Sequence, residues 1–215
     1  MGWTHYLFRK KEVWKTTWKF RVAILCILAL VLIPTRGIWL SWIGRSLTHQ
    51  DQPASADFIV VEYYAPNYLL FEKARILMED GGGKAVLIPT EIHDEDEPSP
   101  ITRDIANALI SNSRLENSVL VPVEHREPIT LHVARRIALK LQEEEAQSVT
   151  IVSPTFRSRR SYLVYRSVLD PLGIEVQCVH PIEPKGPDNW WTSLHGIQDV
   201  TLEATKLVYY RLLVL

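Results

Sequence analysis

A run of thirteen uncharged, mostly apolar residues, 22–34, constrains this chain more than any other feature, because it separates a basic head from a long polar remainder. The first 50 residues hold eight Lys and Arg against one acid, a charge of +7, so the rest carries −8 of the total of −1. Basic residues beside an apolar span resist translocation. The layout predicts a cytoplasmic head, one anchor in the inner (cytoplasmic) membrane, and an acidic periplasmic domain.

The apolar run by itself is shorter than the roughly 20 residues that a full span requires. It reaches that length if residues 35–43 extend it, with Arg36 snorkelling to the interface or pairing with another group. Pro34 and Gly37 predict a kink or a helix end inside this stretch. The expected organisation is a head over residues 1–20, a transmembrane anchor over 21–43, a linker over 44–56 and the domain over 57–215.

A cleaved signal peptide and a buried helix are the alternatives to a retained anchor, since 7–15 apolar residues also suit a signal peptide. The residues after Ile33 lack a small-x-small cleavage site, which favours a signal anchor that stays in place. Aromatic and Arg side chains are favoured at interfaces. Arg36, Trp39 and Trp42 are therefore candidates for contact with the membrane or with another membrane protein.

Apolar runs and amphipathic stretches alternate through the remaining chain, which predicts an α/β domain. Continuous apolar strands between helices indicate a parallel sheet covered on both faces. We expect a Rossmann-like three-layer sandwich with about five mainly parallel strands. Its buried strand centres are predicted to be Val60, Val86, Leu120, Ile151 and Val176. The expected strands cover residues 58–63, 85–88, 119–123, 149–152 and 174–179, and the expected helices cover 68–79, 100–111, 128–144, 158–169 and 191–212.

Four segments in this order carry a family resemblance. Residues 56–64 are ADFIVVEYY, residues 119–134 are VLVPVEHREPITLHVA, residues 151–176 begin IVSPTFRSRR, and residues 190–210 are WWTSLHGIQDVTLEATKLVYY. They are similar to the SanA/YdcF/ElyC envelope family, whose members commonly join an N-terminal helix to a small Rossmann-like domain. The resemblance covers residues 20–215. It implies an envelope enzyme or ligand binder that handles a phosphorylated, nucleotide-like or lipid-linked carrier.

The chain departs from that family where a ligand would bind. Residues 62–65 (EYYA) replace a Gly-rich turn, residues 89–91 (PTE) replace SGG, and residues 130–133 (TLHV) lack the family's Glu and Asn. Arg157 stands where the family has His. Glu124, Thr130, Ser153, Arg160 and Glu203 are retained. We therefore expect a degenerate site in a non-catalytic, membrane-anchored interaction or scaffold protein, with the family's enzymatic or ligand-binding function as the alternative and no cofactor indicated.

Ligands in open α/β sheets bind beyond the carboxyl ends of the strands. The cluster Arg157, Arg159 and Arg160 opens a helix after the fourth strand and suits a small anion such as phosphate or carboxylate. The alternative is ion pairing with acids at neighbouring strand ends, and we expect Arg160 to contact Glu124. The candidate ligand-binding residues are Glu62, Glu91, Glu124, Thr130, Ser153, Thr155, Arg157 and Arg160.

Other polar segments are weaker candidates. His125 lies between two glutamates and suits acid–base chemistry, but such a loop is more often only solvated. The acidic run 93–97 lacks the spacing and Gly of a calcium loop, so we expect a solvated loop and no metal. A domain of charge −8 does not suit nucleic acid. Trp190 and Trp191 either pack against the sheet, cover an apolar groove, or face the membrane.

Overall fold

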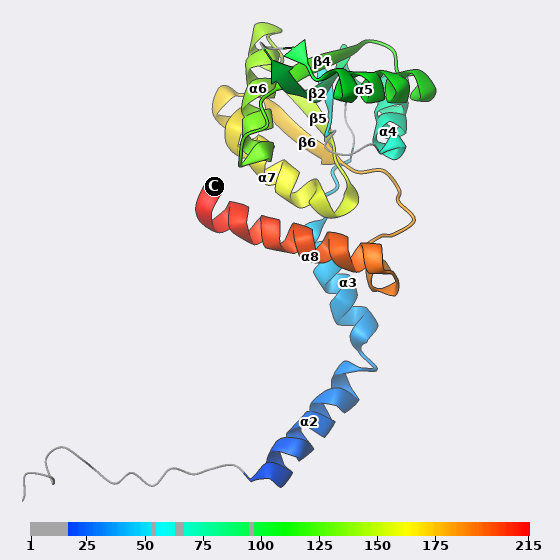
Figure 1. Ribbon diagram of the computed structural model, residues 1–215, viewed down its shortest axis with the longest axis vertical. Helices are drawn as coiled ribbons and strands as arrows, with labels where there is room; N and C mark the ends of the chain where they lie inside the picture. The colour runs from blue at the N-terminus through cyan, green and yellow to red at the C-terminus, as the bar shows by residue number, and fades with distance from the viewer. Residues whose placement is uncertain (1–16, 53–54, 63–66, 95–96) are drawn as a thin grey trace, which may run out of the picture. The chain divides into compact units, whose positions relative to one another are not determined.

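The computed structural model describes residues 17–52, 55–62, 67–94 and 97–215 (Figure 1). The chain divides into two compact units, Met1–Trp39 and Leu40–Leu215. The larger unit contains the predicted α/β domain. Residues 63–66, which include two tyrosines expected at the first strand end, lie outside the described residues.

Five strands of the larger unit form a parallel sheet in the order β4-β2-β1-β5-β6. The chain builds outward from β1 in one direction and then, from β5, in the other, so the order reverses between β1 and β5. This reversal is the topological switch point of Rossmann-like folds, and the predicted α/β sheet is confirmed. The strands are β1 (Phe58–Val61), β2 (Ala85–Asp94), β4 (Ser118–Val123), β5 (Ser148–Val152) and β6 (Glu175–Val179), and a short β3 (Glu97–Pro98) pairs antiparallel with β2.

Helices cover both faces of the sheet. Successive strand side chains point to opposite faces, and because they are apolar here, both faces must be buried. Ile59 and Val61 of β1 pack in one cluster with α4 (Tyr68–Glu79) and α5 (Pro100–Ser113). Phe58 and Val60 pack on the other side with α6 (Ile129–Glu143) and α7 (Ser158–Leu169). The helix α4 begins where the side chain of Asn67 accepts a hydrogen bond from the Leu69 N–H, as N-caps do.

A third cluster joins the terminal helix α8 (Leu194–Tyr209), which ends in a π-helical turn at Tyr210–Val214, to α3 (Arg36–Leu47). Leu47, Trp190 and Leu207 are buried together in it. The Trp190 Nε1–H donates to the Leu40 carbonyl at 3.0 Å. Trp190 therefore packs between α3 and α8 and not against the sheet as expected. Residues 40–47 belong to the larger unit, although the sequence placed residues 44–47 in a linker.

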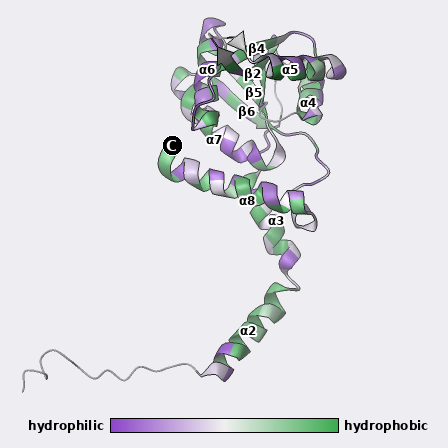
Figure 2. Cartoon of the chain, viewed as in Figure 1, coloured by the Kyte–Doolittle hydropathy of each residue, from purple (hydrophilic) through white to green (hydrophobic). Residues whose placement is uncertain are grey.

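The smaller unit contains α2 (Trp18–Leu32), whose side chains are exposed and mostly hydrophobic (Figure 2). A break at residues 33–35 separates α2 from α3, so the expected kink or helix end near Pro34 is confirmed, and the segment predicted as one transmembrane helix consists of two helices. No single helix among the described residues is long and apolar enough to cross a membrane, but α2 and α3 meet the length and composition test as a bent pair.

Two of the remaining expectations differ from the structure. Val60, Val86, Ile151 and Val176 are buried, whereas Leu120 is only half-buried, because β4 forms an edge of the parallel sheet. The strand expected at residues 85–88 continues to residue 94, where Asp94 pairs with Glu97 of β3. Part of the acidic run 93–97 is thus strand and not loop, while residues 95 and 96 lie outside the described part of the chain.

The packing of α3 makes a prediction about Gly44. A methyl group there would lie 2.7 Å from the Pro187 carbonyl oxygen and 3.0 Å from Trp190 Cδ1. Overpacking costs about 1–3 kcal/mol, more than the gain of up to about 1 kcal/mol from replacing Gly in a helix. Gly44→Ala should therefore lower the free energy of unfolding, measured in denaturant. Gly186→Ala is the control, because its methyl meets no atom within 4 Å; equal effects of the two changes would contradict this packing.

Candidate functional site

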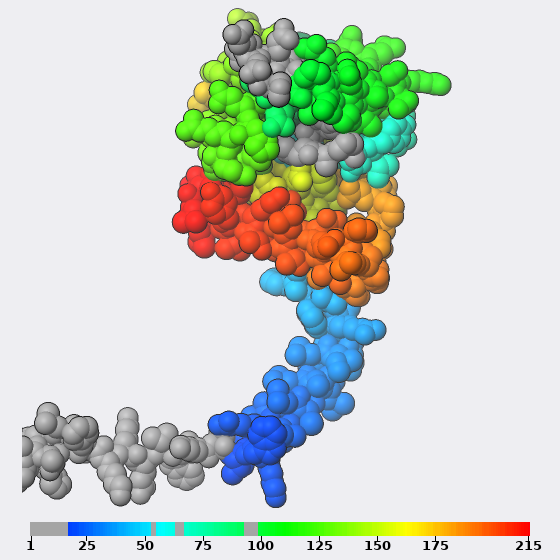
Figure 3. Space-filling view, viewed as in Figure 1, coloured from blue at the N-terminus to red at the C-terminus, as the bar shows by residue number. Residues whose placement is uncertain are grey.

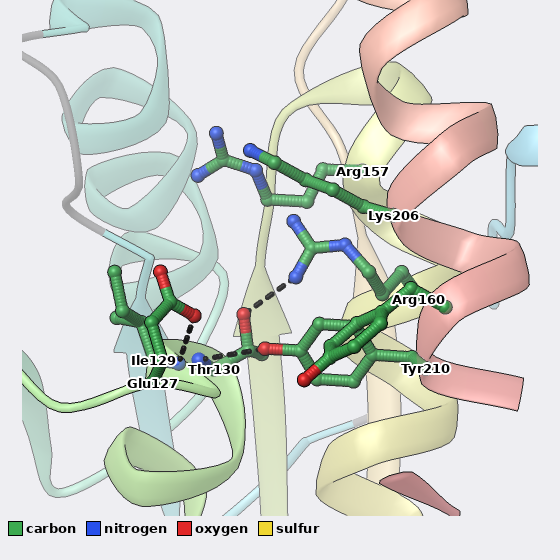
Figure 4. Close-up of a pocket in the computed structure, with 8 residues that line it drawn as sticks. Glu127, Ile129, Thr130, Arg157, Arg160, Lys206 and Tyr210 are labelled. Atoms are coloured by element: carbon green, nitrogen blue, oxygen red, sulfur yellow. Dashed lines mark hydrogen bonds between the residues drawn. The ribbon is translucent and has the colours of Figure 1, made fainter. Parts of the chain in front are cut away.

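A pocket of about 250 Å³ lies where the starts of α6 and α7 meet the end of α8 (Figure 4). Because α6 follows β4 and α7 follows β5, the pocket lies at the carboxyl edge of the sheet, where α/β folds bind ligands. Three of the lining side chains are cationic and one is acidic. The lining residues are Glu127, Ile129, Thr130, Arg157, Arg160, Lys206, Tyr209 and Tyr210.

The carboxylate of Glu203, on the buried side of α8, holds the three cations together. Its Oε2 accepts hydrogen bonds from Arg160 Nε at 3.1 Å and Nη2 at 2.9 Å. Its Oε1 lies 3.5 Å from both Arg157 Nε and Lys206 Nζ. Arg160 Nη1 donates to Thr130 Oγ1 at 2.5 Å. One buried ion pair thus ties α8 to α7 and, through Thr130, to α6.

Both members of this ion pair stay charged at neutral pH. Burial acts to raise the pKa of the Glu203 carboxyl, but Arg160 and Arg157 outweigh it and lower that pKa. Burial likewise acts to lower the pKa of Arg160, but Glu203 and then Glu62 outweigh it and raise that pKa. The pocket lining itself carries three cations and one carboxylate, Glu127, while the carboxylates of Glu203 and Glu62 are buried behind it. Such a pocket suits an anion.

The start of α6 adds backbone donors to the pocket. The Thr130 N–H donates to the Tyr210 hydroxyl at 3.2 Å, and the Ile129 N–H donates to Glu127 Oε2 at 3.3 Å. The guanidinium of Arg160 lies 5.1 Å from the centre of the Tyr210 ring, a cation–π distance. Figure 4 shows the charged ends of Arg157 and Lys206 on the same side of Arg160. Cationic and N–H donors therefore converge from three helices.

A second polar group is buried at the switch point between β1 and β5. Glu62 follows β1 and is fully buried. Its Oε2 accepts hydrogen bonds from the hydroxyls of Ser153, at 2.6 Å, and Ser161. Its Oε1 accepts no hydrogen bond from the residues that the structure describes. Glu62 also helps to raise the pKa of Arg160, so this buried group stabilises the charged form of the guanidinium.

The expected ligand-binding residues fall into separate places. Thr130, Arg157 and Arg160 line the pocket, and Glu62 and Ser153 form the buried group behind it. The remaining three lie elsewhere. Thr155 is buried and its N–H donates to Glu183 at 3.3 Å, Glu91 is exposed and pairs with His125 at 3.0 Å, and Glu124 is exposed.

The expected contact between Arg160 and Glu124 is wrong. Arg160 lies on the side of α7 that faces α8, so Glu203 is its partner. Glu124 follows the edge strand β4 and is exposed. Arg36 and Trp39, in the smaller unit, are exposed, as is Trp42 in the larger one.

Lys206, Tyr209 and Tyr210 were missed as site residues. Their signal lay in the spacing of the terminal helix, where residues three and four apart share a face. Glu203, Lys206 and Tyr210 follow this spacing, and the retained Glu203 marked the face.

Comparison with known proteins adds no relative. No protein-family model matches this chain, and no curated protein matches its sequence. The similarity to the SanA/YdcF/ElyC family therefore stays a prediction from the four segments that carry it.

The buried ion pair predicts how stability depends on pH. Because the folded-state pKa of Glu203 is lowered, its stabilisation is present above the ordinary value of 4.5 and is lost as the pH falls through the lower folded value. Glu203→Gln should cost on the order of 3–5 kcal/mol at pH 7, and the difference from wild type should shrink as the pH falls below 4.5. Unfolding curves across that range measure it. Glu116→Gln, at an exposed site, is the control, and a cost independent of pH would contradict the pairing.

Proposed function

We propose that this chain is a membrane-anchored binding protein for a small anionic ligand, whose phosphate or carboxylate group enters the pocket between α6, α7 and α8. The observation that carries this proposal is the convergence of Arg157, Arg160 and Lys206 on one pocket, where the buried carboxylate of Glu203 holds them together. The cationic lining and the hydroxyl and N–H donors around it match an acidic group.

The lining residues have different roles in this proposal. Arg160 is a positioning residue, since three of its nitrogens already donate to Glu203 and Thr130. Lys206, whose side chain is 41% exposed, reaches the ligand directly. The Ile129 N–H donates a hydrogen bond to the carboxylate of Glu127. An anionic ligand would replace this carboxylate and accept the same hydrogen bond at the start of α6.

The proposed membrane topology and location are based on the sequence. The basic head supports a cytoplasmic N-terminus and an extracytoplasmic main domain. The resemblance to the SanA/YdcF/ElyC family supports an envelope location and a phosphorylated, nucleotide-like or lipid-linked ligand. The residues EYYA after β1 do not suit the Gly-rich pyrophosphate cradle of dinucleotide-binding proteins, so a single terminal phosphate or carboxylate is the better match.

An interaction or scaffold function is the second candidate. It is favoured by the exposed apolar side chains of α2, with Leu30 75% exposed, and by the exposed Arg36, Trp39 and Trp42 beside them in the sequence. Such groups suit lateral contact with another membrane protein. One chain could have both functions. A measurement of anion binding tests the first of them separately.

Inorganic phosphate is the probe for the pocket. Added to the full chain in detergent at constant ionic strength, it should raise the melting temperature in a saturable way. Lys206→Ala should weaken phosphate binding about tenfold, as expected for the loss of one hydrogen bond to a charged group worth ~1.5 kcal/mol. Lys140→Ala is the control, because Lys140 pairs with Glu143 and Glu144 outside the pocket.

Acetate, tested in the same way, distinguishes a carboxylate ligand from a phosphate. A response no larger than that to chloride, or one equal in wild type and Lys206→Ala, would overturn the ligand-binding proposal. The scaffold function would then be the better account of the chain.

A further inference from the structure

The helix α8 exposes apolar side chains on the side that faces away from the domain, in addition to those that it buries against the domain. Gly196, Val200, Glu203 and Leu207 are buried against the domain. On the opposite side, at helical spacing, apolar side chains are 42–77% exposed. We call this the outer face of α8, and it consists of Leu194, Ile197, Leu202, Val208, Leu212 and Leu213.

The outer face is mostly uncharged. The exposed residues between its apolar members include Gln198, Thr201 and Thr205, which carry no charge, and His195, while Asp199 is exposed at its edge. In Figure 3 the atoms of α8, orange to red, form a band along the surface of the larger unit. Contiguous exposed apolar patches of this kind mark interaction sites. The helix therefore has one face for the domain and a second for something outside it.

The position of α8 in the larger unit indicates what that partner is. The helix packs against the second half of α3 through Leu47, Trp190 and Leu207. Leu40, which accepts the Trp190 hydrogen bond, is the first residue of this unit and is bonded directly to Trp39. The chain therefore joins this unit through α3, the helix against which α8 packs. Trp42, on the same part of α3, is 72% exposed, as interfacial tryptophans are.

The charges beside the outer face fit a lipid surface. Helical spacing places Lys206 and the exposed Asp199 on one border of the face, and Arg211, in the π-helical turn, lies on the other, so the borders carry a net charge of +1. An apolar face bordered by basic residues is typical of helices that lie in the boundary between headgroups and acyl chains. We propose that the outer face of α8 lies on an anionic membrane surface, the same membrane that the N-terminal apolar segment enters. This contact does not depend on the pocket ligand.

The contact has a consequence for the pocket. Lys206 and Tyr209 of α8 also line it. A helix that rests on the membrane would hold the pocket close to the headgroups, where an anionic group on a lipid is present at high local concentration.

A fluorescent probe at the centre of the outer face tests the contact in the full chain. Thr205→Cys, in a Cys26→Ser background, carries an environment-sensitive NBD label, while Cys178 is fully buried and its raised pKa, due first to burial, keeps its thiol unreactive. The protein is reconstituted into vesicles of phosphatidylcholine and phosphatidylglycerol, with or without brominated acyl chains. We expect a blue shift and quenching by the brominated lipid. Glu116→Cys, exposed in the loop before β4, should show neither.

Each other outcome counts against the proposal. A probe at position 205 with the spectrum of water would show that lipid does not cover the face. A blue shift without quenching by brominated lipid would show that protein covers it, and energy transfer between differently labelled copies would identify a second copy of this chain. Leu202→Glu with Val208→Glu, both at exposed sites, should abolish quenching at position 205 but preserve the response to phosphate; unchanged quenching would overturn the contact.

Discussion

The structure depends on one buried ion pair, between Arg160 of α7 and Glu203 of α8. Charges removed from water are costly unless they are paired and fully hydrogen-bonded. Here the guanidinium donates twice to the carboxylate and once to Thr130, as Figure 4 shows. The pair thereby fixes α8, which lies outside the two helix layers of the sheet, against the starts of α6 and α7. Together with the buried apolar cluster of Leu47, Trp190 and Leu207, it sets the position of the pocket residues on α8.

Under the proposed function, the same pair would let a Rossmann-like edge bind an anion without a Gly-rich turn. Glycine-rich turns bind phosphate through close backbone approach, which EYYA after β1 does not suit. In this chain side chains from three helices supply the donors, and Glu203 holds cations that would otherwise repel one another. The buried Glu62, bonded to Ser153 and Ser161, provides a further negative charge behind them.

Periodicity gave good predictions for elements whose pattern is local. Both bounds of α4 and α7 were predicted, because an apolar stripe recurs at helical spacing in each. The five parallel strands were predicted from their continuous apolar runs, although β2 extends six residues beyond its predicted end, where β3 pairs with its polar part. The break after α2 was predicted from Pro34. These features depend on residues that are close in the sequence.

Features set by contact between distant segments were not predictable. Arg160 and Glu203 are 43 residues apart on different helices, and Glu124, at a predicted strand end, was the expected partner. The burial of Trp190 depends on α3, whose carbonyl at Leu40 is 150 residues away in the sequence. Lys206 and Tyr210 became site residues only because α8 crosses the carboxyl edge of the sheet. A single sequence holds no signal for such pairings beyond the spacing of the terminal helix.

The central claim is that Arg160 and Glu203 act as a unit, and a double-mutant cycle tests it most directly. Arg160→Met, Glu203→Leu and the double variant are compared with wild type by denaturant unfolding at pH 7. The ion pair predicts a double variant that is closer to wild type than the sum of the single effects, with a coupling energy above about 1 kcal/mol. Additive effects would contradict the claim, since they would show that each side chain contributes to stability independently of the other.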